Sequence, residues 1–323
     1  MPHVVVLTTG GTISSRRTGD SVIAVDDASQ VLAGIDFGDD VIVEAQDVLR
    51  VGSYRMTFAD LRTVAEAVSK QLARPDVDGV VVTHGTDTLE ETAVLLDLVH
   101  AEPGAVVLTG AQRSADVADT DGPRNLRDAV AVAAHPAARH HGAVIVFDGS
   151  VYAARGVRKS HTLDLAAFSS PAGTVGVVHS GTVRMHSLPI RPQALPAPRA
   201  EFDAARVDIV LSYLGGDDTL LHAAVAAGAR GIVLAGTGLG NAPAGVAETV
   251  AKLVSDGVVV ALSTRVAAGP VLPVYGHGGG ADLVAAGAVP VTLPAAQARI
   301  ALALLLSSGR SPADVTAALG RYA

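Results

Sequence analysis

Hydrophobic residues in the first half of the chain come in short continuous runs, each followed by a turn rich in glycine and threonine. Three such segments are 4–12 (VVVLTTGGT), 79–88 (GVVVTHGTDT) and 105–112 (AVVLTGAQ). Strands that are apolar on both faces are typical of a parallel sheet covered on both sides. The pattern therefore predicts a buried parallel strand at the start of each segment.

Helical patterns lie between these runs. Thr57, with Asp60 three residues later, resembles a capping box and predicts a helix to about Ala73. Further helices are expected at 90–100 and 123–134. Strands that alternate with helices predict an α/β fold whose sheet is doubly wound and mainly parallel.

A proline-rich stretch divides the chain. Ser187 to Ala200 (SLPIRPQALPAPRA) holds four prolines and is typical of a connection between domains. The α/β pattern then resumes, with strands expected at 207–214, 231–236 and 258–262 and helices at 217–227, 244–255 and 294–306. We therefore expect a larger N-terminal domain at 1–188, a linker at 189–207 and a smaller α/β C-terminal domain at 208–323.

Composition excludes several kinds of chemistry and partner. The chain has no cysteine, which excludes disulfides, thiol catalysis and cysteine metal sites and fits a reducing compartment. Its net charge is −8 with 3% aromatic residues and no block of basic residues, so we expect neither a nucleic-acid nor a membrane partner. The eleven histidines form no metal-binding pattern, and we expect no metal and no cofactor.

The expected location follows from what the chain lacks. It holds no run of eighteen uncharged apolar residues, and its first residues (MPHVVVLTTG) form a strand pattern without a basic, signal-like start. We expect a cytoplasmic protein, with a secretory signal that has already been removed as the alternative.

The first candidate for chemistry is the turn Thr8 to Thr12 (TTGGT). Gly10 and Gly11 let the backbone approach a ligand, present free N–H groups and direct the Thr12 hydroxyl. Taken alone, a Gly-Gly turn after a strand is more often structural, and neither phosphate-binding glycine motif is present.

The second candidate is His84 to Thr92 (HGTDTLEET). Its simplest interpretation is a helix start, with Thr86 or Asp87 as the cap and the two glutamates favouring the helix dipole. That interpretation does not explain two hydroxyl-rich turns at the carboxyl ends of strands in one sheet, which is where ligands bind in such folds.

Together, TTGGTI and HGTDTLEET resemble the two signature segments of the bacterial L-asparaginases. Further matches follow in order along nearly the whole chain, at 51–53, 109–126, 156–164, 236–241 and 263–266. The resemblance implies an amidohydrolase that hydrolyses the side-chain amide of L-asparagine, with L-glutamine as a further candidate substrate. It also implies a homo-oligomer, either a dimer or a tetramer.

The resemblance assigns catalytic roles position by position. Thr12 matches the nucleophile, and Thr86, Asp87 and Lys159 match a second cluster in which lysine and carboxylate flank a threonine hydroxyl. A threonine hydroxyl needs a nearby base or cation to react, and Lys159 could move a proton. A surface lysine is the plainer alternative for Lys159, but this chain has only three lysines, Lys70, Lys159 and Lys252.

Binding roles follow in the same way. Ser53 matches a ligand of the substrate α-carboxylate, Asp87 also matches a ligand of its α-amino group, and Asn241 matches a residue donated by the neighbouring subunit's smaller domain. The Gly11 turn would stabilise the oxyanion through its N–H groups. Tyr54 stands where the family often has glutamine.

The chain departs from the family pattern in two other segments. Residues 13–35 lack the tyrosine of the commonly described mechanism, and 267–280 lack the glutamate that many members supply to a partner's site. Tyr54 and Tyr275 are candidates for the missing phenol, with simple packing as the alternative. Residues 14–29 are expected to form a mobile lid after the nucleophile.

Two competing hypotheses remain open. One is an asparaginase-like subunit of a tRNA-dependent amidotransferase, although such subunits carry a further N-terminal domain and here the strand pattern begins at His3. The other is a two-domain binding protein without catalysis, which would not require Thr12, Thr86 and Lys159 together.

Overall fold

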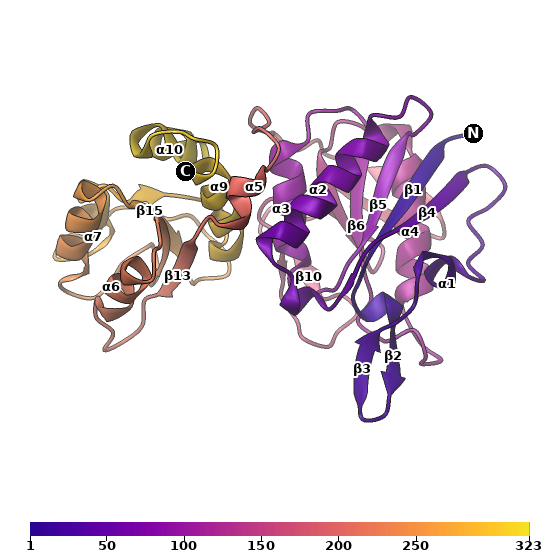
Figure 1. Cartoon of the computed structure of the whole chain (residues 1–323), viewed down its shortest axis with the longest axis horizontal. Coiled ribbons are helices and arrows are strands. Elements are labelled where there is room, and N and C mark those ends of the chain that lie inside the picture. Colours follow the sequence, from indigo (N-terminus) through magenta and orange to yellow (C-terminus); the bar gives the residue numbers. More distant parts are fainter. Residues whose placement is uncertain (323) are drawn as a thin grey trace. The chain divides into compact units, whose positions relative to one another are not determined.

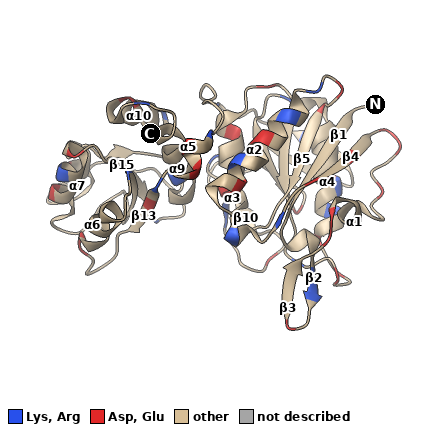
Figure 2. Ribbon diagram, in the orientation of Figure 1, with Lys and Arg blue, Asp and Glu red and all other residues tan. Residues whose placement is uncertain are grey.

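The computed structural model describes residues 1–322, which divide into two compact units after Ala197 (Figure 1). Both units are α/β, as the sequence predicts. Acidic and basic residues are interspersed over the ribbons of each unit (Figure 2). Within the described part of the chain, no helix has the length and apolar character needed to cross a bilayer.

An eight-stranded sheet forms the centre of the first unit, in the order β12-β11-β8-β7-β6-β5-β1-β4. The neighbours from β4 to β7 are parallel: β4 (Ile42–Val51), β1 (His3–Gly10), β5 (Gly79–Thr83), β6 (Ala105–Thr109) and β7 (Ala143–Phe147). The remaining three pair antiparallel: β8 (Ser150–Ala153), β11 (Gly176–His179) and β12 (Thr182–Met185). The predicted doubly wound, mainly parallel sheet is confirmed.

Helices cover both faces of this sheet. Helices α2 (Phe58–Leu72) and α3 (Leu89–Val99) pack on one face, whereas α4 (Gly122–Ala134) and the short α1 (Ala28–Leu32) pack on the other. All side chains of β1, β5, β6 and β7 are buried, because a parallel sheet between two helical layers has no solvent-facing side. The capping box of Thr57 and Asp60 at the start of α2 is confirmed.

Shorter elements complete the first unit. They are the hairpin β2 (Ser15–Thr18) and β3 (Ser21–Ala24), the pair β9 (Arg158–Lys159) and β10 (Phe168–Ser169), and the 3₁₀ turns at Thr12–Ser14, Ser53–Arg55 and Pro136–Ala138. These elements place most of the candidate site residues.

The stretch expected as a linker, 189–207, is largely attached to packed structure. Arg191 forms an ion pair with the buried Asp97 at 2.8 Å, and the N–H of Leu195 donates to the carbonyl of Leu98. Helix α5 (Ala200–Asp203) follows, with Phe202 fully buried. Prolines keep the stretch irregular, but its apolar and charged side chains attach it to its surroundings.

The second unit has a four-stranded parallel sheet in the order β13-β14-β15-β16. Its strands are β13 (Val207–Leu211), β14 (Gly231–Gly236), β15 (Val259–Thr264) and β16 (Val289–Pro290). Its helices are α6 (Thr219–Ala226), α7 (Val246–Ser255), α8 (Gly280–Ala285), α9 (Ala295–Leu306) and α10 (Pro312–Leu319), before a 3₁₀ turn at Gly320–Tyr322. The sequence pattern predicted three of these strands and three of these helices, but it missed β16, α8 and α10.

Candidate active site

The two hydroxyl-rich turns follow adjacent strands, β1 and β5, and their backbones touch. A Cβ on Gly11, whose φ is +81°, would clash with the backbone nitrogen of Gly85. A Cβ on Gly85 would in turn lie 2.6 Å from the Ser53 hydroxyl. Because neither position has room for a side chain, the glycines allow the segments that carry Thr12, Ser53 and Thr86 to converge.

A cavity of about 400 Å³ opens where these turns meet. Its walls combine the predicted site residues of the first unit other than Lys159 with the lid segment and the end of β4. They include Gly11, Thr12, Val22, Ile23, Ser53, Tyr54, Thr86 and Asp87. Within residues 1–322 the Thr12 hydroxyl has no hydrogen-bond partner, so it is available to a ligand. The structure thus gathers the predicted nucleophile and five predicted binding residues, Gly11, Ser53, Tyr54, Thr86 and Asp87, around one space.

Lys159 contacts the other two residues of the second cluster, Thr86 and Asp87, through its ammonium group. Its Nζ donates to Oγ1 of Thr86 and to Oδ1 of Asp87, each at 2.8 Å. The Lys159 side chain is 18% exposed, whereas that of Asp87 is 55% exposed. Lys159 is therefore not a free surface lysine, and Asp87 can contact both the ammonium of Lys159 and a ligand in the cavity.

Gln112 is a site residue that the sequence analysis did not single out. Thr86 donates its hydroxyl hydrogen to Oε1 of Gln112 at 3.0 Å, which leaves the oxygen of Thr86 to accept from Lys159. Asp121 fixes this glutamine by accepting its main-chain N–H. Gln112 lies just beyond the end of β6, so a third adjacent strand end was the signal that could have identified it.

His84 supports the second turn from within the core. Its Nδ1 lies 2.8 Å from the carbonyl oxygen of Gly85 and must carry the hydrogen, so Nε2 accepts from the Thr92 hydroxyl at 2.8 Å. Burial lowers the pKa of His84 to about 4, partly opposed by the Gly85 carbonyl. His84 is therefore neutral near pH 7 and holds Gly85 and α3 together.

The start of α3 differs from the simple interpretation of its sequence. The cap position is Thr88 rather than Thr86 or Asp87, and the Thr88 hydroxyl donates to the carbonyl of Ser53 instead of capping the helix. Thr86 and Asp87 are free of a capping role, which leaves their side chains for Lys159, Gln112 and the cavity.

The expected lid, 14–29, contains the β2–β3 hairpin followed by the start of α1. Its side chains Val22 and Ile23 line the cavity while 46% and 47% exposed. The main-chain N–H of Arg17 donates to Asp116 at 2.8 Å, and Arg16 pairs with Asp26 at 2.7 Å. A hairpin held by few contacts beside the cavity suits a movable cover.

The two candidate tyrosines differ in their surroundings. Tyr54 lines the cavity, is 73% exposed and packs its ring over Gly52. Tyr275 belongs to the second unit and is 58% exposed. Tyr54 is the candidate that shares a cavity with Thr12.

Asn241 also belongs to the second unit, in the turn after β14. Its Oδ1 accepts the N–H of Gly280 at 2.9 Å, and its main chain bridges to Thr237. The side-chain oxygen therefore supports the start of α8, while the amide nitrogen remains as the donor for any ligand.

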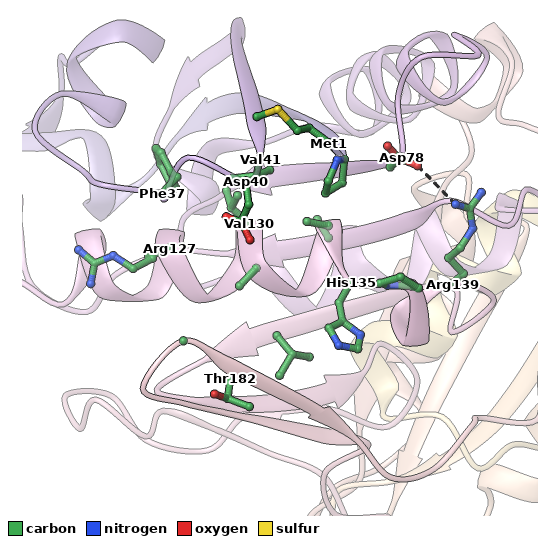
Figure 3. Close-up of a pocket in the computed structure, with 17 residues that line it drawn as sticks. Met1, Phe37, Asp40, Val41, Asp78, Arg127, Val130, His135, Arg139 and Thr182 are labelled. Atoms are coloured by element: carbon green, nitrogen blue, oxygen red, sulfur yellow. Dashed lines mark hydrogen bonds and ion pairs between the residues drawn. The ribbon is translucent and has the colours of Figure 1, made fainter.

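A larger cavity, of about 820 Å³, lies near the opposite ends of the strands (Figure 3). Met1 and Asp78 precede β1 and β5, and α4 contributes Val130; Asp78 pairs there with Arg139 at 3.4 Å. It contains none of the predicted site residues. Within the described residues, no group of three or more histidine and acidic side chains could hold a metal ion.

A doubly wound domain with two threonine-bearing turns beside one cavity, followed by a smaller α/β domain, is the arrangement expected of an amidohydrolase-like class of protein. The family model "Asparaginase, N-terminal" matches residues 3–191, and "Glutaminase/Asparaginase C-terminal domain" matches residues 206–319. The chain therefore belongs to the L-asparaginase family of enzymes.

Individual relatives match over most or nearly all of the chain. A probable L-asparaginase of Deinococcus radiodurans is 38% identical, over 98% of this chain and 96% of the relative. A glutaminase-asparaginase of Pseudomonas aeruginosa is 35% identical, over 83% of this chain and 77% of its own. The crystal structure of a probable cytoplasmic L-asparaginase from Campylobacter jejuni superposes with a TM-score of 0.86 at 30% identity, covering 99% of both chains.

Proposed function

We propose that this enzyme hydrolyses the side-chain amide of L-asparagine to L-aspartate and ammonia, with Thr12 as the nucleophile. The observation that carries the proposal is the junction of the two turns, where the open Thr12 hydroxyl shares a cavity with Thr86, and Thr86 accepts a hydrogen bond from Lys159. The full-length likeness to proteins named L-asparaginase supports this choice of substrate. L-Glutamine is the second candidate substrate, because one relative is named a glutaminase-asparaginase.

The reaction takes two steps. Thr12 Oγ1 attacks the amide carbon, and the hydroxyl proton passes to the leaving nitrogen as ammonia departs and an acyl-enzyme ester forms. Water then attacks the ester, releasing L-aspartate and returning a proton to Thr12. Backbone N–H groups of the Gly11 turn stabilise the oxyanion in both steps. Tyr54 is the candidate to relay the Thr12 proton, because both residues line the same cavity.

The residues around the second turn bind the substrate and activate the reacting groups. Asp87 accepts hydrogen bonds from the substrate α-ammonium, and Ser53, beside Tyr54, binds the α-carboxylate. Thr86 and Lys159 form a hydrogen-bonded pair that activates the attacking group or water. Asn241 completes the site from a neighbouring subunit's smaller domain, so the active form is a homo-oligomer.

The other hypotheses have less support. Likeness to a probable cytoplasmic L-asparaginase over 99% of both chains favours an amidohydrolase over an amidotransferase subunit, and it favours a cytoplasmic location. A pure binding protein would not need a lysine held against a threonine at the cavity edge.

Ammonia release from L-asparagine and L-glutamine tests the proposal. Thr12→Ala and Thr86→Ala should each remove most of the activity, since losing an activated nucleophile or its partner raises the barrier by roughly 5 kcal/mol. Thr63→Ala is the matched control, because its hydroxyl bonds only to the carbonyl of Ala59 on α2. If either site variant keeps more than about a tenth of the wild-type kcat with normal circular dichroism, its threonine is not essential.

A further inference from the structure

Residues 86–90 hold Lys159 both at its side-chain ammonium and at its main-chain N–H. At its tip, Nζ donates to Thr86 and Asp87. At its backbone, the N–H of Lys159 donates to Oε2 of Glu90. Thr86, Asp87 and Glu90 follow one another from the strand-end turn into the first turn of α3, so a shift of this lysine relative to α3 would break contacts at two separate points.

The strand that carries Lys159 is too short to hold itself in place. Strand β9 has two residues and pairs with the two residues of β10, and the pairing continues for one step, where Ser160 donates its N–H to the carbonyl of Ala167 at 2.7 Å. Phe168 anchors β10 in the core, 5.1 Å from the ring of Phe147. Isolated two-stranded pairs are marginal in stability, and this one has a single short ladder. A side-chain acceptor from α3 therefore adds a further contact to the main chain of β9.

The contact with β9 places the Glu90 carboxylate in a partly buried position, which disfavours its charged form. A carboxylate in the first turn of a helix already favours the dipole while fully hydrated, and Glu91 occupies that turn as well. Glu90 is instead partly buried, and burial raises its pKa to about 7, with Glu91 adding to the effect. The N–H of Lys159 and the charges of Arg158 and Lys159 oppose that rise. Helix stability alone does not require a glutamate turned inward onto β9.

We propose that Glu90 is a positioning residue of the active site, whose carboxylate fixes the main chain of Lys159 so that Nζ stays between Thr86 and Asp87. The inference rests on the proposed function for the role of Lys159 in the reaction. A displacement of about 1 Å in a reacting group can lower the rate by about 100-fold. Loss of the Glu90 acceptor should therefore lower kcat although Glu90 touches no substrate.

Four variants separate the possible roles of Glu90. Glu90→Ala removes the acceptor, Glu90→Asp keeps the charge but shortens the reach, and Glu90→Gln keeps an acceptor oxygen at full reach without the charge. Glu91→Gln is the matched control, since it removes a carboxylate from the same turn of α3. We expect Ala and Asp to lower kcat by about 10- to 100-fold with KM within about threefold, and Gln and the control to stay within about threefold of wild type.

Two kinetic outcomes would overturn the inference. One is a wild-type kcat in Glu90→Asp or in a folded Glu90→Ala. The other is a Glu90→Gln variant as impaired as Glu90→Asp, since that would make the charge rather than the hydrogen bond decisive. Thermal unfolding of each variant shows which of them fold. If Glu90→Ala does not fold, the comparison of Glu90→Asp with Glu90→Gln still tests the inference.

The position of Lys159 can also be measured by NMR without any reaction, because the chain has only three lysines. Carbon-13 at the lysine Cε gives three resonances, and those of the exposed Lys70 and Lys252 serve as internal references. The Lys159 resonance, identified by its loss in Lys159→Arg, should move towards the references in Glu90→Asp and stay in place in Glu90→Gln. A resonance that does not move in Glu90→Asp would overturn the inference. If the resonance behaves as expected while the wild type releases no ammonia, the positioning holds and the proposed function fails.

Discussion

At the residue scale, His84 makes the stability of the protein depend on pH in a defined direction. The pKa of His84 is about 4 in the folded chain and near 6.5 when the chain unfolds. Between these values the unfolded state binds the extra proton, so the contribution of a neutral His84 is complete above pH 6.5 and is lost as pH falls towards 4. The difference corresponds to about 3 kcal/mol.

We therefore expect His84→Gln to lower the free energy of unfolding more at pH 7 than at pH 5. Glutamine keeps one polar group for Thr92 but does not titrate. Glu90 acts in the opposite sense, because its folded pKa is raised and its contribution is lost as pH rises towards 7. Because Glu90 is present in both proteins, its contribution cancels when the free energies of unfolding of wild type and variant are subtracted at each pH. Urea unfolding at both values is the measurement, and an equal difference at pH 5 and pH 7 would contradict the assignment.

At the scale of elements, the β2–β3 hairpin is the part of the site best placed to move. It carries Val22 and Ile23 over the cavity but is attached beyond its own ladder by few contacts, among them the bond from Arg17 to Asp116. Closing such a cover over bound substrate would exclude bulk water from the site.

Trypsin offers a direct test, because Arg16 and Arg17 lie in the hairpin and Arg17 is exposed. We expect cleavage there to slow severalfold with saturating L-aspartate, since a bound product would hold the hairpin closed. Asp116→Ala should speed cleavage, whereas Asp119→Ala should not, because Asp119 pairs with Arg113 in the same loop. Equal cutting with and without L-aspartate would count against a lid.

At the scale of the whole molecule, we expect a closed homo-oligomer whose sites lie between subunits. Thr12→Ala and Asn241→Asp should each be inactive alone. The Asp variant keeps the oxygen that accepts from Gly280 but loses the amide donor. When the two variants are co-expressed and dimerise at random, about half of the dimers are mixed. One of the two sites in each mixed dimer combines an intact Thr12 with an intact Asn241 from the partner, so about a quarter of all sites should be active. A fully active monomer in light scattering, or no recovery of activity in the hybrid, would rule out shared sites.

The sequence by itself determined the fold class and supplied most of the candidate site residues. Continuous apolar strands between amphipathic helices have one stable arrangement, a parallel sheet covered on both faces, so β1, β5 and β6 were predictable. Short elements were not: β9, β16 and α8 carry too few residues for a periodic signal, and their existence depends on packing. Thr12, Thr86 and Asp87 became candidates because their turns follow those strands and because both turns resemble the signature segments of the family.

Only the tertiary structure decided how these residues act on one another. A hydrogen bond between residues 73 positions apart, such as Lys159 to Thr86, has no local signature and was expected only through the family resemblance. The acceptor role of Gln112 was not expected at all. The sequence favoured Glu90 as a dipole residue, because first-turn glutamates are common there. The fold instead turns Glu90 onto β9, since a two-residue strand needs an acceptor that its own ladder lacks. Local pattern specifies elements, whereas contacts between distant segments determine which side chains meet.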